Sequence, residues 1–278
     1  MRRLVEVFRA AGLRFSQDGC AFFAQAIAFN ALFAVFPILI LTVAAMGFIY
    51  GTDDGQARAL ALIGTLAPSV QPILTENLHH AVAFRGISGA IALVALVWSG
   101  KNLFRSLAYA LDRALGVSQS RPLFKDILTS IFILPILGGL LLLATAIPLV
   151  ISFVVETGAF RQAVVLTQIA GYGTGVVLVF VVVALFYDFL PNRKVRLGFG
   201  IPGAIVTTLA YELAQIAFAV YSTHVDFRHV YGALAAVAIL LLWFYYMGYI
   251  FLFGAEFSAQ WLEHTQEKGG SLETRRSA

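Results

Sequence analysis

The segment AFFAQAIAFNALFAVFPILILTVAAMGFIY, Ala21–Tyr50, contains no Asp, Glu, Lys or Arg. A helix needs roughly 20 predominantly apolar residues to cross a hydrocarbon core of about 30 Å, so this segment is long enough to span a membrane. It is also longer than the apolar region of a secretory signal peptide, roughly 7–15 residues, which argues against a cleaved leader. We interpret it as the first transmembrane helix.

The composition of the whole chain agrees with this interpretation. Of the 278 residues, 60% are hydrophobic and 12% are charged, whereas soluble domains average about 25% charged residues. The sequence predicts an all-α fold: a polytopic membrane protein with one six-helix transmembrane domain over residues 1–262 and a disordered cytoplasmic tail over residues 263–278. The six apolar stretches are Ala21–Tyr50, Ile87–Leu107, Ile127–Val155, Val165–Leu190, Phe199–Tyr221 and Ala233–Trp261.

The basic residues predict the orientation of these helices. Most of the 19 Lys and Arg residues fall in the amino-terminal segment, in the connections after the second and fourth spans, and in the tail. The positive-inside rule places such segments in the cytoplasm, so we expect both termini there. No basic surface is interleaved with stacking aromatic residues, which makes a nucleic-acid partner improbable.

Two connections have a helical pattern of their own. The first outer connection, Gly51–Gly86, has apolar residues at helical spacing, and we expect short amphipathic helices at the outer membrane surface. The segment WSGKNLFRSLAYALDRALGV, Trp98–Val117, continues the second span with charged residues on polar positions. It predicts an amphipathic helix that leaves the membrane and rests its apolar face on the bundle.

Glu212 is the most unusual residue of the fifth apolar stretch, because it lies close to the membrane midplane. Thr208 and Gln215 lie one turn to either side of it, on the same helical face. Ionisable groups at this depth face protein or water and often belong to substrate pathways. Two interpretations stay open: a polar stripe lining a substrate path, or a hydrogen-bonding anchor between helices.

Other polar residues are candidates for the same path or for its cytoplasmic end. Asn30 lies in the inner half of the first span, and Pro37 predicts a kink two turns beyond it that could open a cavity. Candidates for headgroup binding or gating are Arg105, Arg193, Lys194 and Glu256. For Glu256 an ion pair with one of these bases is the alternative.

Catalytic and metal-binding motifs are not recognisable. The paired His79 and His80 lack an HExxH or Cys/His pattern, and the single Cys20 cannot form an intrachain disulfide. There is no phosphate-binding loop or acidic cluster of the kind that holds catalytic magnesium. The sequence therefore predicts a protein that is not an enzyme and that needs no metal or other cofactor.

Four segments carry a resemblance to a known family: FLPNRKVRLGFGIPGAIVTTLAYELAQIAFAVY, VYGALAAVAILLLWFYYMGYIFLFGAEFSAQ, AIAFNALFAVFPILIL and LVWSGKNLFRSLAYALDRALGV. Through them the sequence resembles the YihY/BrkB family of bacterial inner-membrane proteins. It runs over about residues 10–262. The family-like positions are Pro37, Arg105, Pro191, Asn192, Pro202, Gly203, Glu212, Tyr231, Gly232, Gly254 and Glu256.

The resemblance implies six helices with cytoplasmic termini. Members have carried a ribonuclease label or have been called virulence factors, and a transport role that includes envelope lipids has been suggested for the family. The chain departs from the family at Asn30, where a tyrosine is frequent, and this puts the chemistry of that cavity in doubt.

The function expected from these observations is transport of a lipid or other amphiphile through a polar-lined groove. One alternative is a membrane scaffold that transports nothing, and another is a proton-coupled transporter of small solutes. The expected partners are membrane lipids, and a homo-oligomer or an envelope protein is a further possibility. The sequence leaves open the substrate, the direction of movement and the energy source.

Overall fold

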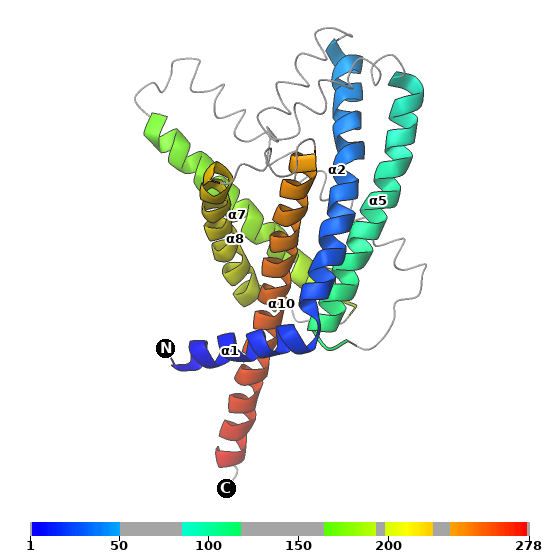
Figure 1. Ribbon diagram of the computed structural model, residues 1–278. Helices are drawn as coiled ribbons and strands as arrows, with labels where there is room; N and C mark the ends of the chain where they lie inside the picture. Colours follow the sequence, from blue (N-terminus) through cyan, green and yellow to red (C-terminus); the bar gives the residue numbers. More distant parts are fainter. Residues whose placement is uncertain (1, 51–84, 118–163, 193–197, 225–233, 277–278) are drawn as a thin grey trace. The chain divides into compact units, whose positions relative to one another are not determined.

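The structure of the chain is a computed structural model, and it describes residues 2–50, 85–117, 164–192, 198–224 and 234–276. Within these ranges the chain forms six helices and no strands, which confirms the predicted all-α class (Figure 1). The helices are α1 (Arg2–Gln17), α2 (Cys20–Tyr50), α5 (Arg85–Ala114), α7 (Val164–Phe189), α8 (Ile201–His224) and α10 (Ala235–Arg276).

Three of the described helices are long and apolar enough to cross a membrane. These stretches are Cys20–Ile38 of α2, Ile201–Phe218 of α8 and Val237–Thr265 of α10, and α7 contains a shorter apolar stretch, Gly175–Phe189. The predicted third span, Ile127–Val155, and the outer connection Gly51–Gly86 lie outside the described residues. The count of six spans therefore stays a prediction.

The chain divides into two compact units. The first contains Met1–Ala24, Leu107–Val220 and Tyr246–Ala278, and the second contains Gln25–Ser106 and Tyr221–Tyr245. Each unit is described by itself. The prediction of a single domain over residues 1–262 stays a prediction.

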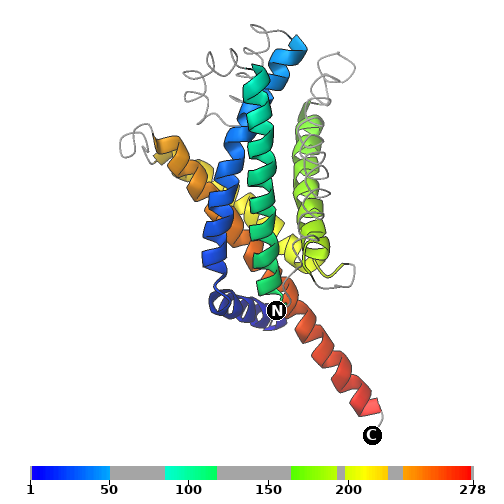
Figure 2. The same ribbon diagram turned by 90° about the vertical axis from the view of Figure 1, so that its right-hand side faces the viewer.

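Helix α1 packs crosswise on α10 in the first unit (Figures 1 and 2). Val7 and Ala11 are fully buried and form a core with Phe257 of α10. The ring of Phe15 lies 4.3 Å from that of Tyr249. Val7, Ala11 and Phe15 recur every four residues and so share one face of α1. No helix was predicted for this segment.

Helices α8 and α10 approach each other through small residues. The amide of Gly203 donates a 2.8 Å hydrogen bond to the Ser258 hydroxyl. A Cβ atom on Gly254 would lie 2.6 Å from the Tyr187 hydroxyl and would also clash with Thr207. Gly203 and Thr207, like Gly254 and Ser258, are four residues apart, which is the spacing that lets membrane helices come close.

Two aspartates fix the chain between α7 and α8. The carboxylate of Asp188 accepts the amides of Gly198 at 2.9 Å and Gly200 at 2.8 Å. The buried Asp112, near the end of α5, accepts the amide of Asn192 at 2.6 Å. These bonds satisfy amides that have no helical partner at the end of α7 and the start of α8.

Helices α5 and α10 both run beyond their apolar stretches. Helix α5 is continuous to Ala114, so the helix predicted after the second span is part of the same helix. Helix α10 continues to Arg276, and the disorder predicted for residues 263–278 stays a prediction. The tail contains Gln, Glu and Lys residues with high helix propensity, and no proline follows Trp261 to stop the helix.

Candidate functional site

An apolar cavity of about 450 Å³ lies between α2 and α5 in the second unit. Its lining residues, which we call the α2/α5 groove, are Phe33, Phe36, Pro37, Ile40, Ile91, Ala92, Ala95, Trp98 and Ser99. They recur at intervals of three and four residues on each helix, so one stripe of α2 faces one stripe of α5. The volume is within the usual range of small-molecule pockets, about 300–1,000 Å³.

The groove has a buried floor and exposed apolar walls. Pro37, Ala92 and Ser99 are buried, whereas Phe33, Phe36, Ile91 and Trp98 are exposed. Pro37 has no N–H to donate to the carbonyl of Phe33, and its ring crowds that carbonyl, so α2 cannot be a regular helix beside the groove. The proline predicted to open a cavity does line one.

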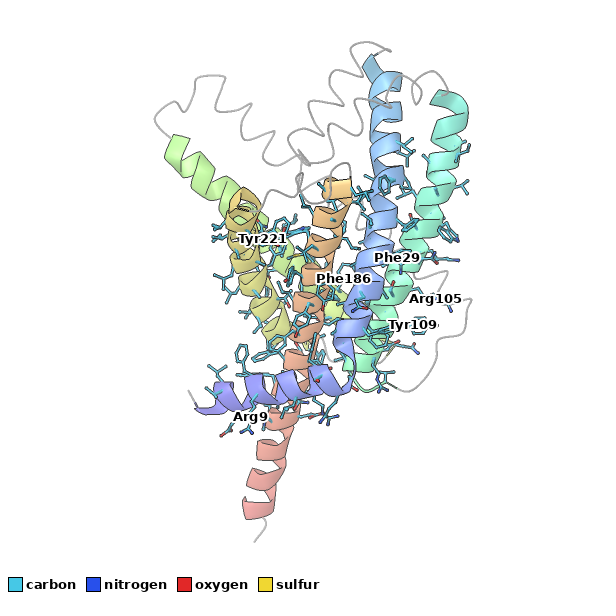
Figure 3. All side chains as sticks on the ribbon, in the orientation of Figure 1. Arg9, Phe29, Arg105, Tyr109, Phe186 and Tyr221 are labelled. Atoms are coloured by element: carbon cyan, nitrogen blue, oxygen red, sulfur yellow. The ribbon has the colours of Figure 1, made fainter. Side chains whose placement is uncertain are left out.

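A polar pair follows the groove toward the start of α2. The Asn30 side-chain amide donates a 2.7 Å hydrogen bond to the Ser106 hydroxyl, which in turn donates a 2.7 Å bond to the Asn102 carbonyl. Asn30 is three residues from Phe33, or about 4.5 Å along the helix. Arg105 is exposed one residue before Ser106 on α5 (Figure 3). The facing sides of α2 and α5 are thus apolar along the α2/α5 groove and polar at the Asn30–Ser106 pair.

The polar stripe predicted on α8 belongs to the first unit. Thr208 is buried, and its hydroxyl has no hydrogen-bond partner among the residues that the structure describes. Glu212 is partly buried and Gln215 is exposed. Exposure thus increases along the stripe toward the carboxyl end of α8. Because Asn30 belongs to the second unit, a path shared by Asn30 and Glu212 stays a prediction.

A hydrogen-bonded network beside this stripe was not predicted. The buried Tyr187 hydroxyl lies 2.7 Å from the Thr207 hydroxyl and 2.5 Å from the Phe251 carbonyl oxygen. A carbonyl only accepts, so the single tyrosine proton goes to Phe251 and Thr207 donates to Tyr187. The sequence offers no signal for this network, because its members lie on α7, α8 and α10.

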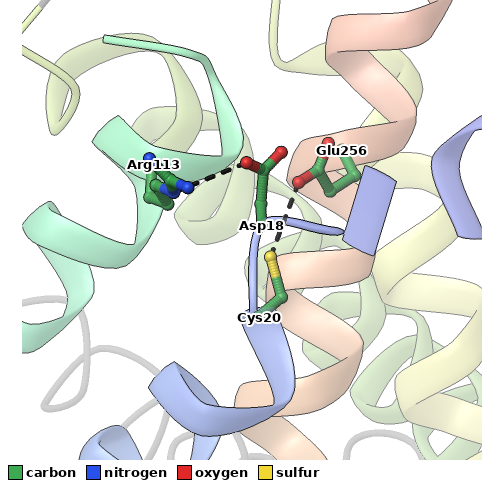
Figure 4. Close-up of polar contacts among 4 residues, drawn as sticks. All are labelled: Asp18, Cys20, Arg113 and Glu256. Atoms are coloured by element: carbon green, nitrogen blue, oxygen red, sulfur yellow. Dashed lines mark hydrogen bonds and ion pairs between the residues drawn. The ribbon is translucent and has the colours of Figure 1, made fainter. Parts of the chain in front are cut away.

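Glu256 is 1% exposed on α10 and accepts a 3.5 Å hydrogen bond from the Cys20 thiol (Figure 4). Two residues before Cys20, the Asp18 carboxylate lies 3.4 Å from the Arg113 guanidinium. Arg193 and Lys194, two candidate partners of Glu256, lie outside the described residues. In the part of the chain that the structure describes, the hydrogen-bond donor to Glu256 is therefore a thiol.

No cluster of three or more potential metal ligands occurs among the residues that the structure describes. The side chains of the groove are hydrocarbon apart from the Ser99 hydroxyl and the indole N–H of Trp98. This arrangement can bind an apolar chain by excluding water from it.

A family model described as virulence factor BrkB matches residues 11–277. The chain belongs to this family. Among its relatives, a Bacillus subtilis protein called ribonuclease-like protein YfkH is 26% identical over 254 residues, covering 87% of this chain and 89% of that protein. A UPF0761 membrane protein of Coxiella burnetii is 29% identical over 270 residues, covering 87% and 88%.

Another UPF0761 membrane protein, from Alteromonas mediterranea, is 25% identical over 263 residues and covers 92% of this chain and 87% of that protein. No solved structure matches the chain. The BrkB family, the names of the relatives and the apolar helices together identify a membrane protein. The family confirms the resemblance seen in the sequence.

Proposed function

We propose that this BrkB-family protein is a transport protein of the bacterial inner membrane that moves, or helps to move, a lipid or similar amphiphile. The observation that carries the proposal is the α2/α5 groove, an apolar cavity followed on the same two helices by a polar pair. An amphiphile has the same division, with an apolar chain at one end and a polar headgroup at the other.

The groove fits the apolar chain of such a substrate. Phe33, Phe36 and Trp98 supply large apolar surfaces, and the small side chains of Ala92 and Ala95 leave room between the helices. Burying apolar surface contributes about 25 cal/mol per Å², so one acyl chain in the groove gains several kcal/mol over water. The acyl chain gains little free energy when it moves from bulk lipid into the groove. Such weak binding suits a site through which a substrate passes.

The polar end fits the headgroup. Asn30 and Ser106 can exchange their mutual hydrogen bond for bonds to phosphate or hydroxyl oxygens, and the exposed Arg105 supplies a positive charge nearby. One basic residue near a membrane surface contributes about 1 kcal/mol of attraction to anionic lipid. An anionic phospholipid is therefore the favoured substrate class.

The test is transfer of a fluorescent phospholipid by the full chain reconstituted in liposomes. Ala95→Phe fills the groove, and Val97→Phe places the same phenylalanine side chain at an exposed position on the same helix. Overpacking costs about 1–3 kcal/mol, so Ala95→Phe is expected to slow transfer about tenfold. Val97→Phe is expected to leave the rate unchanged. Wild-type protein that moves no labelled lipid contradicts the proposal and favours the scaffold alternative.

A further inference from the structure

The amphipathic helix α1 has an apolar strip that neither the groove nor the proposed transport function uses. The buried face of α1, with Val7 and Ala11, packs on α10. Beside that face lie Leu4, Val5 and Phe8, which are 46%, 66% and 43% exposed. We call these three residues the α1 strip. Large apolar side chains exposed side by side on one helix mark a contact with a membrane or another protein.

Helix α1 is joined directly to one long apolar helix and packs on another in the first unit. It ends at Gln17, and after a turn at Gly19, which has φ 68°, the apolar helix α2 begins at Cys20. Helix α1 also contacts Phe253 and Phe257 in the carboxyl-terminal half of the apolar stretch Val237–Thr265 of α10. Because only two residues separate α1 from α2, a membrane that α2 enters lies close to α1.

The charge of α1 identifies the kind of surface that fits it. The helix carries Arg2, Arg3, Arg9 and Arg14 against one acidic residue, Glu6. Arg9, Arg14 and Glu6 are exposed, and Arg9 projects from the polar side of the helix (Figure 3). Leu13, 56% exposed, interrupts that side. A basic polar face beside an exposed apolar strip is typical of helices that lie in the interface of anionic membranes.

We propose that α1 lies flat on the membrane surface, inserts the α1 strip between lipids, and binds anionic headgroups through its arginines. The basic side chains then hold lipids of one charge beside the first membrane-spanning helix. This binding surface is separate from the α2/α5 groove, and it stands whether or not the protein transports lipid.

The experiment compares environment-sensitive fluorophores on the strip with matched positions on the polar side. Single cysteines are introduced as Leu4→Cys, Val5→Cys, Glu6→Cys and Gln17→Cys in a Cys20→Ser background, because Ser keeps a donor for Glu256. The full chain is placed in nanodiscs of phosphatidylglycerol and phosphatidylcholine. Labels at positions 4 and 5 are expected to emit at shorter wavelength, to resist aqueous cobalt and to be quenched by spin-labelled lipid. Labels at positions 6 and 17 are expected to emit at longer wavelength, to be quenched by aqueous cobalt and to resist spin-labelled lipid.

Two results overturn the proposal. Equal quenching by cobalt at all four positions means that the strip faces water. Protection of positions 4 and 5 from both quenchers means that protein covers the strip, as in contact with a second copy.

Charge is tested separately in nanodiscs of phosphatidylcholine alone. The emission of the label at position 5 is expected to shift to longer wavelength there, and Arg9→Gln with Arg14→Gln is expected to give the same shift with phosphatidylglycerol present. Equal emission in both lipids overturns the assignment to an anionic surface.

Discussion

The Cys20 thiol donates a hydrogen bond to Oε1 of Glu256 across 3.5 Å, joining the first residue of α2 to a buried carboxylate of α10. Both side chains are buried, and they lie 236 positions apart in the sequence. When a buried hydrogen-bond acceptor loses its donor, the free energy spent in removing that acceptor from water is no longer offset by a hydrogen bond. The only cysteine of the chain is thus a structural partner of the most buried glutamate among the residues that the structure describes.

Cys20→Ala is expected to destabilise the protein, because it leaves the Glu256 carboxylate without its donor. The expected loss is about 1–3 kcal/mol of unfolding free energy, read as a lower midpoint of thermal unfolding in detergent. Cys20→Ser keeps a donor and is expected to stay close to wild type. Arg113→Gln breaks a partly exposed ion pair beside this site and should cost less than about 1 kcal/mol. Equal losses for the alanine and serine variants would show that the thiol matters only as volume.

Gly254→Ala is expected to disrupt the contact of α8 with α10. The added methyl group would lie 2.6 Å from the Tyr187 hydroxyl and 2.9 Å from the Gly203 carbonyl oxygen. Overpacking of this kind costs about 1–3 kcal/mol or more. Gly175→Ala on α7 is the matched control, because its methyl group would have no neighbour within 4 Å. Thermal unfolding should separate the two variants, and similar midpoints would contradict the close packing described here.

Thr207→Val and Thr208→Val are expected to have different effects although they make the same chemical change at adjacent positions. Thr207→Val removes the donor to Tyr187 and should cost about 1 kcal/mol. Thr208→Val removes a buried hydroxyl that has no partner within the described part of the chain, so stability should stay the same or rise. If Thr208→Val also slows lipid transfer, Thr208 contacts the substrate. A loss of stability at Thr208 would indicate a hydrogen bond that the structure does not contain.

Glu212→Gln separates the two interpretations of the polar stripe on α8. Glutamine keeps the shape and removes the charge, so a residue of the substrate path should lose transfer activity while the unfolding midpoint holds. A packing anchor should show the reverse. The proton-coupled alternative predicts that the variant loses the pH dependence of solute flux. Measuring transfer, flux and unfolding on one preparation assigns Glu212 to one of these roles.

The helical architecture was readable from the sequence, because a long uncharged apolar run has few other stable structures. Helices α2, α7 and α8 begin within two residues of the apolar stretches predicted to contain them. Helix α1 was not predicted. Its 16 residues are too few to span a membrane, and its arginines were interpreted only as a sign of how the chain is oriented in the membrane. The spacing of Val7, Ala11 and Phe15 was the signal that could have found it.

The candidate site was only partly predictable. Pro37 was predicted to open a cavity, since a proline inside a helix perturbs the backbone wherever it occurs, and it does line the groove. The partners of Asn30 and Glu256, which are Ser106 and Cys20, depend on how distant helices pack. The spacing of residues along one helix carries no information about such pairs. The polar composition of residues 263–278 is typical of disordered segments, yet most of these residues also favour helix, so composition alone does not decide between the two.

The most direct test of the central claim is cross-linking of a phospholipid that carries a photoactivatable group in its acyl chain. Labelling of α2 and α5 peptides that line the groove should saturate as the probe fraction rises, and Ala95→Phe should abolish the saturable part. Val97→Phe should not. Labelling of the exposed Ile205 and Leu209 on α8 should rise in proportion to the probe. Groove labelling that also rises in proportion and ignores Ala95→Phe would contradict a lipid-binding groove between α2 and α5.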